Sequence, residues 1–346
     1  MPIFKQEIIL EAARNVKVFF EVRMGVVRGG MPDAAGDRER LAARDREISR
    51  LKALLAAEGG APTGGVRPEN LIWMFGVART GSSWLGAMMG ELEGHALWNE
   101  PYVGDVFGYA YYMRGGEQQR QRRAYILSDA YKEAWIRSLR TFVLDSVDAR
   151  FPELGKNGCL VIKEPNGSVG APLLSEALPE SRMILLVRDP RDVVASLLAA
   201  QRKGSWGAGD DPLADADPDE FVRQRARMYN ASFGKAWEAY EAHVGRKVVI
   251  RYENLRYDTL GEMEKVYSSL GIPIERERLR EVVEKHAWEN IPDKQKGPDK
   301  PRRKARPGGW QEDLTPEQAR MVEEITAPSM NEFYPAEGRA VATPSD

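Results

Sequence analysis

Residues 71–84 read LIWMFGVARTGSSW. The apolar run Leu71–Phe75 has the length of a buried strand, and the residues from Ser83 onward have the pattern of a helix. Glycines at 76 and 81 have the spacing of a phosphate-binding loop between such a strand and helix. Ser82 stands where a nucleoside triphosphatase has its lysine, which argues against triphosphate hydrolysis. Free backbone N–H groups and the helix N-terminus would still face one anion.

Side chains of this loop can add to the anion site. Arg79 offers a charge-assisted contact, and Ser82 and Ser83 offer hydroxyl donors. Trp84 offers an aromatic face for a base. The alternative is an ordinary Gly-rich strand–helix turn, and only a second anion site would decide between the two.

Outward from the loop, short apolar runs alternate with helical segments. Runs of this length favour strands over buried helices, and the alternation favours a parallel sheet with helices on both faces. We therefore predict an α/β fold, a P-loop-like parallel sheet flanked by helices. Helices are predicted at Ser83–Leu92 and from Pro190, and the further strands at Cys159–Ile162, Met183–Val187 and Lys247–Arg251.

A second candidate anion site follows the third of these strands. Arg188 lies at the strand's exit, where ligands bind beyond the carboxyl ends of parallel strands. Asp189 is predicted to cap the next helix, and Ser196 follows about two turns into it. Arg188 could instead form a structural ion pair with Asp189 or Asp192, a role that suits Arg191 better.

Together the two loops resemble the donor-binding motifs of the sulfotransferase family. Residues 78–84 (ARTGSSW) resemble the loop for the 5'-phosphosulfate, and residues 188–196 (RDPRDVVAS) resemble the 3'-phosphate motif. The resemblance implies that Arg188 and Ser196 bind the 3'-phosphate of the sulfate donor, 3'-phosphoadenosine 5'-phosphosulfate. It covers roughly residues 67–335.

Two further segments fit the same register. Residues 249–255 (VIRYENL) resemble a family strand whose tyrosine lies near the adenine, so Tyr252 is an adenine candidate or a core tyrosine. Residues 303–310 (RKARPGGW) resemble the C-terminal donor loop, with Ala305 in place of its first glycine. The basic run 294–306 is either a flap that closes on the donor or a solvated loop. The donor-binding residues that the resemblance implies are Arg79, Thr80, Gly81, Ser82, Ser83, Trp84, Arg188, Ser196, Tyr252, Arg303, Lys304 and Gly308.

The catalytic base of cytosolic members of the family, a histidine in a Lys-x-His segment, is missing. The matching segment keeps Lys163 but has Pro165 at the histidine position. The chain resembles carbohydrate and tyrosylprotein sulfotransferases in having a glutamate, Glu100, one helix and one turn after the loop. Glu100 is therefore the predicted general base. The alternatives are Glu164 and His95, which we expect in a short turn after the first helix.

Sulfuryl transfer also needs positive charge at the transferring group and the leaving 5'-phosphate. Arg79 and Lys163 are predicted to supply it. Lys163 could equally be a structural ion-pair partner of Glu164.

Residues 1–66 differ from the rest of the chain. Residues 37–58 are highly charged, with leucine and isoleucine at roughly heptad spacing over about two heptads, which is short for a coiled coil. We predict a helical extension with possible homo-oligomer contacts, then a Gly/Pro linker at 59–65 (GGAPTGG). The sulfotransferase domain is predicted at 67–346.

Composition excludes several classes of protein. The net charge of -2 gives no general basic field for nucleic acid. One cysteine, Cys159, excludes an intrachain disulfide framework, and three scattered histidines make a metal site a poor prediction. No apolar run approaches the ~18 residues of a membrane-spanning helix, and no signal peptide is evident, so a cytoplasmic location is expected.

The predicted function is transfer of a sulfuryl group from 3'-phosphoadenosine 5'-phosphosulfate to a hydroxyl of a glycan or small molecule. Aromatic residues at 102–112 could stack on sugar faces or form core, and the Gln/Arg run at 117–123 could meet an anionic glycan or be solvated. A non-catalytic nucleotide-binding scaffold and a P-loop kinase remain as alternatives. The kinase would need a lysine at position 82 and a Mg²⁺-binding acid, and the scaffold would not need Glu100.

Overall fold

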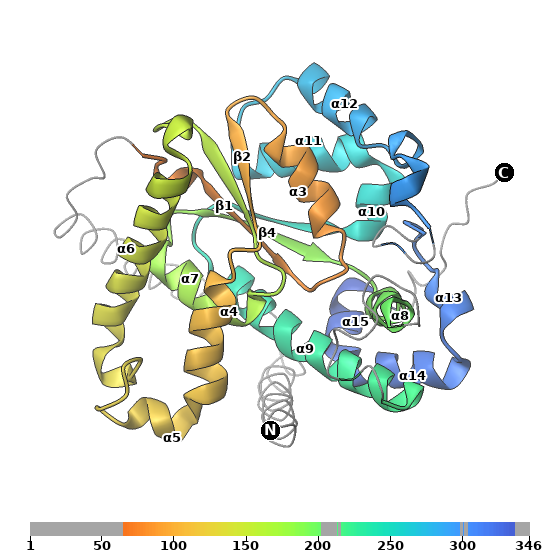
Figure 1. The fold of residues 1–346 in the computed structure, drawn as a ribbon, viewed down its shortest axis with the longest axis horizontal. Helices are drawn as coiled ribbons and strands as arrows, with labels where there is room; N and C mark the ends of the chain where they lie inside the picture. Colours follow the sequence, from red (N-terminus) through yellow and green to blue (C-terminus); the bar gives the residue numbers. More distant parts are fainter. Residues whose placement is uncertain (1–64, 202–212, 214–215, 298–299, 301–303, 336–346) are drawn as a thin grey trace, which may run out of the picture.

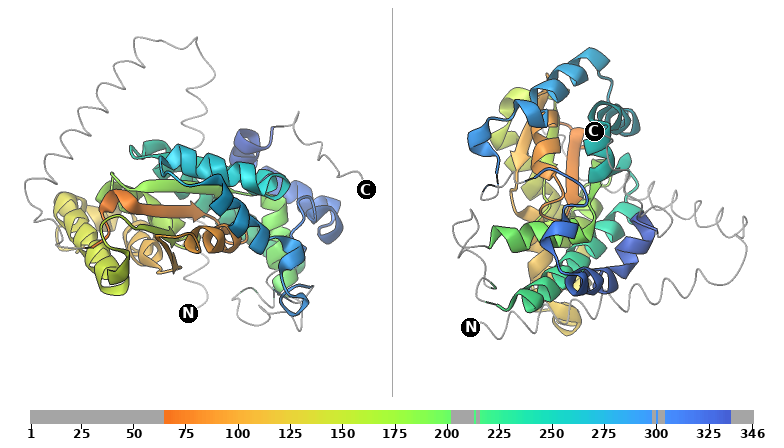
Figure 2. Two further views of the ribbon diagram at one scale, coloured as in Figure 1. Left: turned by 90° about the horizontal axis from the view of Figure 1, so that it is seen from above. Right: turned by 90° about the vertical axis from the view of Figure 1, so that its right-hand side faces the viewer.

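The computed structural model describes residues 65–201, 213, 216–297, 300 and 304–335. They form an all-parallel five-stranded sheet of order β2-β3-β1-β4-β5, with helices on both faces (Figures 1 and 2). This architecture confirms the predicted fold class. The strands are β1 (Leu71–Gly76), β2 (His95–Asn99), β3 (Cys159–Lys163), β4 (Arg182–Val187) and β5 (Lys247–Arg251).

Thirteen α-helices lie in the described ranges, and short 3-10 or π turns join several of them. The α-helices are α3 (Ser82–Gly90), α4 (Val103–Gly108), α5 (Gly116–Gln121), α6 (Lys132–Arg150), α7 (Ala171–Ala177), α8 (Pro190–Ala200), α9 (Pro218–Ala242), α10 (Tyr252–Tyr257), α11 (Thr259–Leu270), α12 (Arg276–Lys285), α13 (Trp310–Asp313), α14 (Pro316–Ile325) and α15 (Ala327–Phe333). The short turns are η1 (Pro68–Asn70), η2 (Tyr109–Arg114), η3 (Asp129–Tyr131), η4 (Pro152–Leu154), η5 (Ser168–Gly170), η6 (Trp288–Asn290) and η7 (Asp293–Gln295). None of the described helices combines the length and apolar composition needed to cross a membrane.

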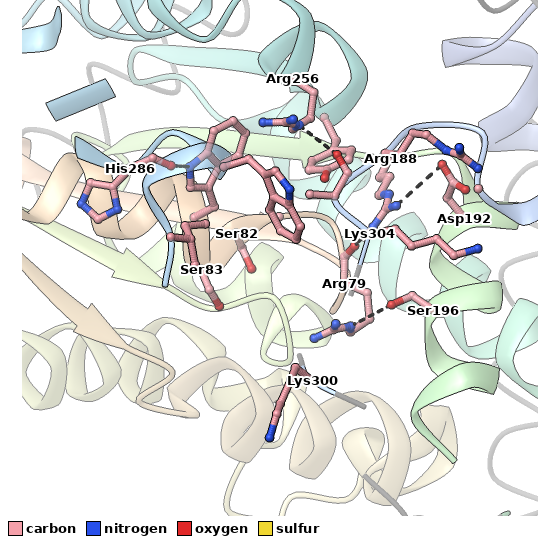
Figure 3. Close-up of a pocket in the computed structure, with 18 of the residues that line it drawn as sticks. Arg79, Ser82, Ser83, Arg188, Asp192, Ser196, Arg256, His286, Lys300 and Lys304 are labelled. Carbon is pink, nitrogen blue, oxygen red and sulfur yellow. Dashed lines mark hydrogen bonds and ion pairs between the residues drawn. The ribbon is translucent and has the colours of Figure 1, made fainter. Parts of the chain in front are cut away.

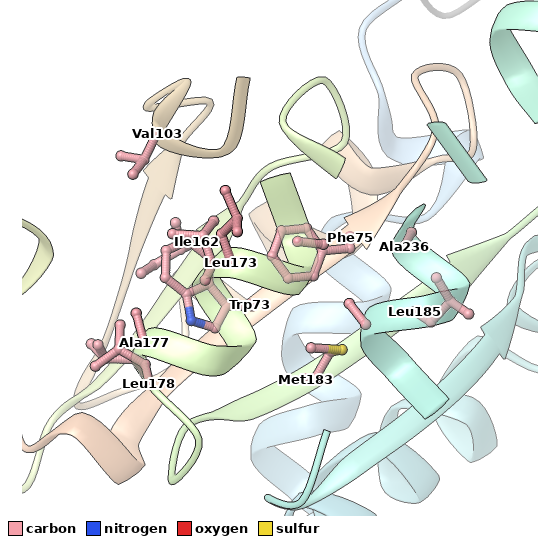
Figure 4. Packing of buried hydrophobic residues seen from close by; sticks show 14 of the residues in the cluster. Trp73, Phe75, Val103, Ile162, Leu173, Ala177, Leu178, Met183, Leu185 and Ala236 are labelled. Atoms are coloured by element: carbon pink, nitrogen blue, oxygen red, sulfur yellow. The ribbon is translucent and has the colours of Figure 1, made fainter. Parts of the chain in front are cut away.

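The central strands are buried on both faces because alternate side chains enter two separate cores. Trp73 and Phe75 of β1 pack with helices α6, α7 and α9 (Figure 4). Ile72 and Met74, on the other face, pack with α3 and α11. The continuous apolar runs in the sequence follow from this double burial.

The predicted strands agree with the structure to within one residue at each end. Strand β2 was missed: His95, expected in a turn, begins an edge strand whose residues are only partly buried. Cys159 is a buried thiol in β3, as expected. Val66, just before the predicted domain start at Arg67, belongs to the core. The predicted helical extension, linker and oligomer contact lie outside the described residues.

Candidate functional site

The loop between β1 and α3 has a backbone that depends on two glycines. A Cβ on Gly76 would lie 2.4 Å from the carbonyl oxygen of Leu186 on the neighbouring strand β4. Gly81 has φ 91° and caps α3, and a Cβ there would lie 2.6 Å from the ring of Tyr252. Because the chain turns this tightly, the first amides of α3 open toward the carboxyl edge of the sheet.

The two predicted anion loops touch each other. Arg79 Nε donates to Ser196 Oγ at 3.2 Å, and Arg188 Nη1 donates to the carbonyl oxygen of Arg79 at 2.9 Å. The Arg188 guanidinium also lies 4.3 Å from the centre of the Tyr252 ring. Segments about 110 residues apart in sequence therefore form one site.

Both loops line a cavity of about 530 Å³ (Figure 3). Its wall contains six Lys or Arg side chains and one carboxylate, Asp192, so the cavity suits a polyanion. The carboxylate is buried, which raises its pKa above the ordinary value, although Arg188 and two backbone amides act in the opposite direction. The lining basic residues are Arg79, Arg188, Arg256, Lys300, Lys304 and Arg306.

Most of the predicted donor-binding residues lie in this wall. Thr80 does not: it is buried, and its hydroxyl donates to the carbonyl oxygen of Val77 within the loop at 2.7 Å. Gly308 does not line the cavity either, and its amide donates to Asp192. Arg303 lies outside the described residues. The predicted residues in the wall are Arg79, Gly81, Ser82, Ser83, Trp84, Arg188, Ser196, Tyr252 and Lys304.

Several lining residues carried no motif in the sequence. Lys300 was indicated by the basic run alone, whereas Arg306 also lies within the donor-loop motif at 303–310. An apolar part of the wall comes from Trp288 and Ile291, just after α12. Trp84 Nε1 donates to the carbonyl oxygen of His286 at 2.9 Å and so joins α3 to this segment.

Ala305, which stands where the resembling motif has a glycine, has a positive φ. Its φ is 49°, in the left-handed region that glycine adopts without strain. Arg256 Nε donates to the Ala305 carbonyl oxygen at 2.9 Å, which fixes the loop against α10. Ala305 thus has a strained backbone that this hydrogen bond helps to hold.

Glu100 lies beside the cavity, where three side chains hold its carboxylate. Lys163 Nζ contacts Glu100 Oε1 at 2.5 Å, and Asn166 Nδ2 and Tyr102 OH donate to Oε2 at 3.1 and 3.3 Å. The same Lys163 donates to Ser83 Oγ at 3.0 Å. One buried cation therefore connects the loop that lines the cavity with the predicted base.

Lys163 pairs with Glu100, and the alternative pairing with Glu164 is absent from the described contacts. Successive residues at the end of a strand point to opposite faces, which separates the two neighbours. Glu164 is fully buried and accepts a hydrogen bond from the Gly104 amide at 3.2 Å. Burial raises its pKa to about 7. His95 begins β2, at the opposite end of that strand from Glu100.

The two arginines of the second loop, Arg188 and Arg191, form different ion pairs. Arg188 forms the alternative ion pair with Asp192, at 3.7 Å, and also lines the cavity, whereas Arg191 pairs with Asp189 at 2.6 Å and with Glu323 of α14 at 2.5 Å. Asp189 also caps α8 by accepting from the Arg191 amide, as predicted. Arg191 is therefore structural, and Arg188 belongs to the cavity. No group of three or more potential metal ligands occurs among the described residues.

Taken together, fold and site define an α/β protein with a cation-lined cavity at the carboxyl edge of a parallel sheet. A model described as "Sulfotransferase family" matches residues 72–276, and the chain belongs to this family. Membership makes it a transferase that moves sulfuryl groups. No curated protein sequence matches the chain.

Solved structures share the fold. The mouse sulfotransferase SULT7A1, complexed with PAP, is 16% identical, with a TM-score of 0.51 over 77% of this chain and 85% of its own. Sulfotransferase STF9 from Mycobacterium avium is 15% identical, with a TM-score of 0.49 over 95% of this chain and 96% of its own.

Proposed function

We propose that this chain transfers the sulfuryl group of 3'-phosphoadenosine 5'-phosphosulfate to an acceptor hydroxyl, with Glu100 as the general base. The observation that carries the proposal is the meeting of the two anion loops in one cavity, through Arg79–Ser196 and Arg188–Arg79. A donor with phosphates at two positions needs two such anion sites at a fixed separation. The structure of mouse SULT7A1 complexed with PAP supports the same donor.

In this proposal the leaving 5'-phosphate lies against the amides of α3 and the side chains of Arg79, Ser82 and Ser83. The 3'-phosphate lies against Arg188 and Ser196. The apolar wall at Trp84 and around Trp288 receives the base. Each assignment matches the chemistry of side chains that line the cavity.

The transfer step requires Glu100 and Lys163 to act as a pair. Glu100 accepts the proton of the acceptor hydroxyl while the acceptor oxygen bonds to sulfur. The bond from sulfur to the 5'-phosphate oxygen breaks, and adenosine 3',5'-bisphosphate leaves with the electron pair. Lys163, which contacts both Glu100 and Ser83, stabilises the charge that develops on the transferring group.

The acceptor is proposed to be a hydroxyl of a glycan or small molecule that approaches along α4. Tyr102, Val106 and Tyr109 are exposed there at helical spacing, and Tyr102 contacts the proposed base. Aromatic faces of this kind stack on sugars and on other flat or apolar acceptors.

Transfer of labelled sulfate to a panel of glycans and small alcohols tests the proposal. Glu100→Gln should lower turnover by roughly 10²–10⁴-fold with unchanged donor affinity, because a general base contributes about that much. Glu164→Gln is the matched control and should keep most of the turnover, since Glu164 faces α4. Loss of turnover in the control alone would transfer the role of base to Glu164.

Donor binding has a separate test by calorimetry with adenosine 3',5'-bisphosphate and ATP. Arg188→Ala should weaken bisphosphate binding at least tenfold, because a charge-assisted contact is lost. Preference for ATP in the native protein would favour a kinase. Bisphosphate binding without transfer to any acceptor would favour a scaffold.

A further inference from the structure

Asp192 is the one carboxylate among the residues that line the cavity, and its position is unfavourable for binding an anion. Its side chain is 2% exposed, so solvent scarcely screens the charge. A negative charge in the same cavity wall as six cations weakens the attraction of those cations for an anionic ligand. Such a residue needs a compensating role.

The contacts of Asp192 show what that role is. Oδ2 accepts from the amide of Gly308 and Oδ1 accepts from the amide of Trp310, both at 2.9 Å. Oδ2 also lies 3.7 Å from Nη2 of Arg188, which stands at the exit of β4, two residues before α8 begins. One carboxylate therefore contacts both the arginine of the second anion loop and the C-terminal loop 304–310, which are more than 110 residues apart in sequence.

The C-terminal loop supplies part of the cationic wall. Lys304 and Arg306 line the cavity, and the loop backbone has the strained residue Ala305. Apart from Asp192, α8 holds this loop through Arg191, whose guanidinium lies 4.0 Å from the centre of the Trp310 ring. Asp192 is the α8 residue that fixes the loop backbone through hydrogen bonds.

Arg188 is fixed in turn by its own neighbours. Nη1 donates to the Arg79 carbonyl oxygen, Nη2 faces Asp192, and the guanidinium lies over Tyr252. Its Nε is buried and has no hydrogen-bond partner within the described part of the chain. This arrangement leaves one buried donor of Arg188 available to an anion.

We infer that Asp192 is a positioning residue that sets Arg188 and the C-terminal loop in register, so that both meet the 3'-phosphate of the donor. This inference rests on the proposed function. Asp192 lowers the net positive charge of the cavity, but it also fixes the positions of Arg188 and of the C-terminal loop that carries Lys304 and Arg306. Its removal has two opposite effects on nucleotide affinity: the charge change strengthens binding, and the loss of geometry weakens it.

The sign of the change in affinity tests the inference. Calorimetry would compare adenosine 3',5'-bisphosphate with adenosine 5'-monophosphate, which lacks the 3'-phosphate. For Asp192→Asn we expect bisphosphate binding to weaken roughly ten- to hundredfold, because an amide group cannot accept from both backbone N–H groups and also pair with Arg188. Monophosphate binding should change less than threefold. A purely electrostatic role predicts tighter bisphosphate binding and would overturn the inference.

Two further variants separate the position of the Asp192 carboxylate from its charge and from the general stability of α8. Asp192→Glu retains the charge but displaces the carboxylate oxygens. This variant should therefore also lose discrimination between the two nucleotides. Discrimination equal to that of the wild type would contradict a positioning role for Asp192. Glu323→Gln removes another ion pair between α8 and the C-terminal segment, away from the cavity, and should bind both nucleotides normally. If Asp192→Asn does not fold, the Glu variant decides.

Equal weakening of both nucleotides by Asp192→Asn or Asp192→Glu would indicate a general structural role and would also overturn the inference. Failure of the proposed function looks different, because the native protein itself would then show no preference for the bisphosphate. In an Arg188→Ala background, Asp192→Asn should cost much less discrimination, since the two residues act together.

Discussion

The non-glycine residues with a strained backbone lie in or beside the proposed site. Four non-glycine residues in the described ranges have positive φ, namely Arg79, Glu100, Tyr102 and Ala305. Arg79 and Ala305 line the cavity, while Glu100 and Tyr102 flank one proline beside it. Each such conformation costs on the order of 1 kcal/mol or more and persists where neighbouring contacts enforce it. Lys163, which contacts Glu100, is one of the residues that enforce it.

Glu164 should make the stability of the protein fall as the pH rises. Its folded pKa of about 7 exceeds the ordinary 4.5, first because of burial. Below pH 4.5 the group is protonated in both states and has no effect. Between pH 4.5 and 7 only the unfolded state ionises readily, so the folded state loses stability, on the order of 3 kcal/mol in all. Urea unfolding at several pH values measures this loss.

The variant Glu164→Gln removes the titration and should flatten this part of the pH profile. Glu277→Gln is the matched control: it replaces an exposed carboxylate on α12 that pairs with Arg280, and it should keep the wild-type slope. Equal slopes in wild type and Glu164→Gln would contradict the assignment.

At the scale of elements, burial decided what the sequence could predict. Strands β1, β3, β4 and β5 produced recognisable apolar runs, because the first three are almost wholly buried and β5 is partly so. Strand β2 lies at the sheet edge with half-buried side chains, and its sequence HALWN has no such run. The part of the cavity wall from His286 to Ile291 could not be predicted from the sequence either. Its hydrogen bond with Trp84 joins residues 202 positions apart, which no local pattern indicates.

Nine of the twelve predicted donor-binding residues line the same cavity, for a different reason. Motifs at 78–84 and 188–196 each follow a strand, so the sheet brings them to one edge whatever lies between. The residues that hold these motifs in position were not indicated by any motif in the sequence. The contact of Asp192 with the C-terminal loop and that of Asn166 with Glu100 depend on tertiary packing alone, whereas Tyr102 is only two residues from Glu100.

The turn into α3 should be sensitive to Gly81→Ala. The new Cβ would lie 2.6 Å from the Tyr252 ring at a φ of 91°, so it is both strained and in collision. We expect a loss of about 2–4 kcal/mol in the free energy of unfolding and at least tenfold weaker binding of adenosine 3',5'-bisphosphate. Thermal unfolding and calorimetry measure the two effects.

Gly94→Ala separates strain from collision. Gly94 also has positive φ, 71°, but a Cβ there would meet no atom within 4 Å. This control should lose only about 1 kcal/mol of stability and bind the nucleotide normally. Similar losses in the two variants would mean that contact with Tyr252 is unimportant.

At the scale of the whole molecule, the residues just before β1 pack against the rest of the described fold. Val66 is buried in the core that covers one face of the sheet. Asn70 Nδ2 donates to the Lys156 carbonyl oxygen at 3.1 Å, and Arg182 Nη1 donates to Asn70 Oδ1 at 3.0 Å. Residues just before β1 therefore join it to the loop before β3 and to β4. We propose that the sulfotransferase domain begins within this short segment, near Arg67.

A pair of truncations tests this boundary. A chain that begins at residue 65 keeps Val66 and Asn70, and should bind adenosine 3',5'-bisphosphate within threefold of the full chain. A chain that begins at residue 71 exposes the core at Val66 and leaves Arg182 without the Asn70 acceptor, which should cost about 3–5 kcal/mol of stability. Thermal unfolding and calorimetry on both chains measure these effects. Lost nucleotide binding in the chain from 65 would place residues 1–64 within the nucleotide-binding unit, and equal stability of the two chains would move the boundary past Asn70.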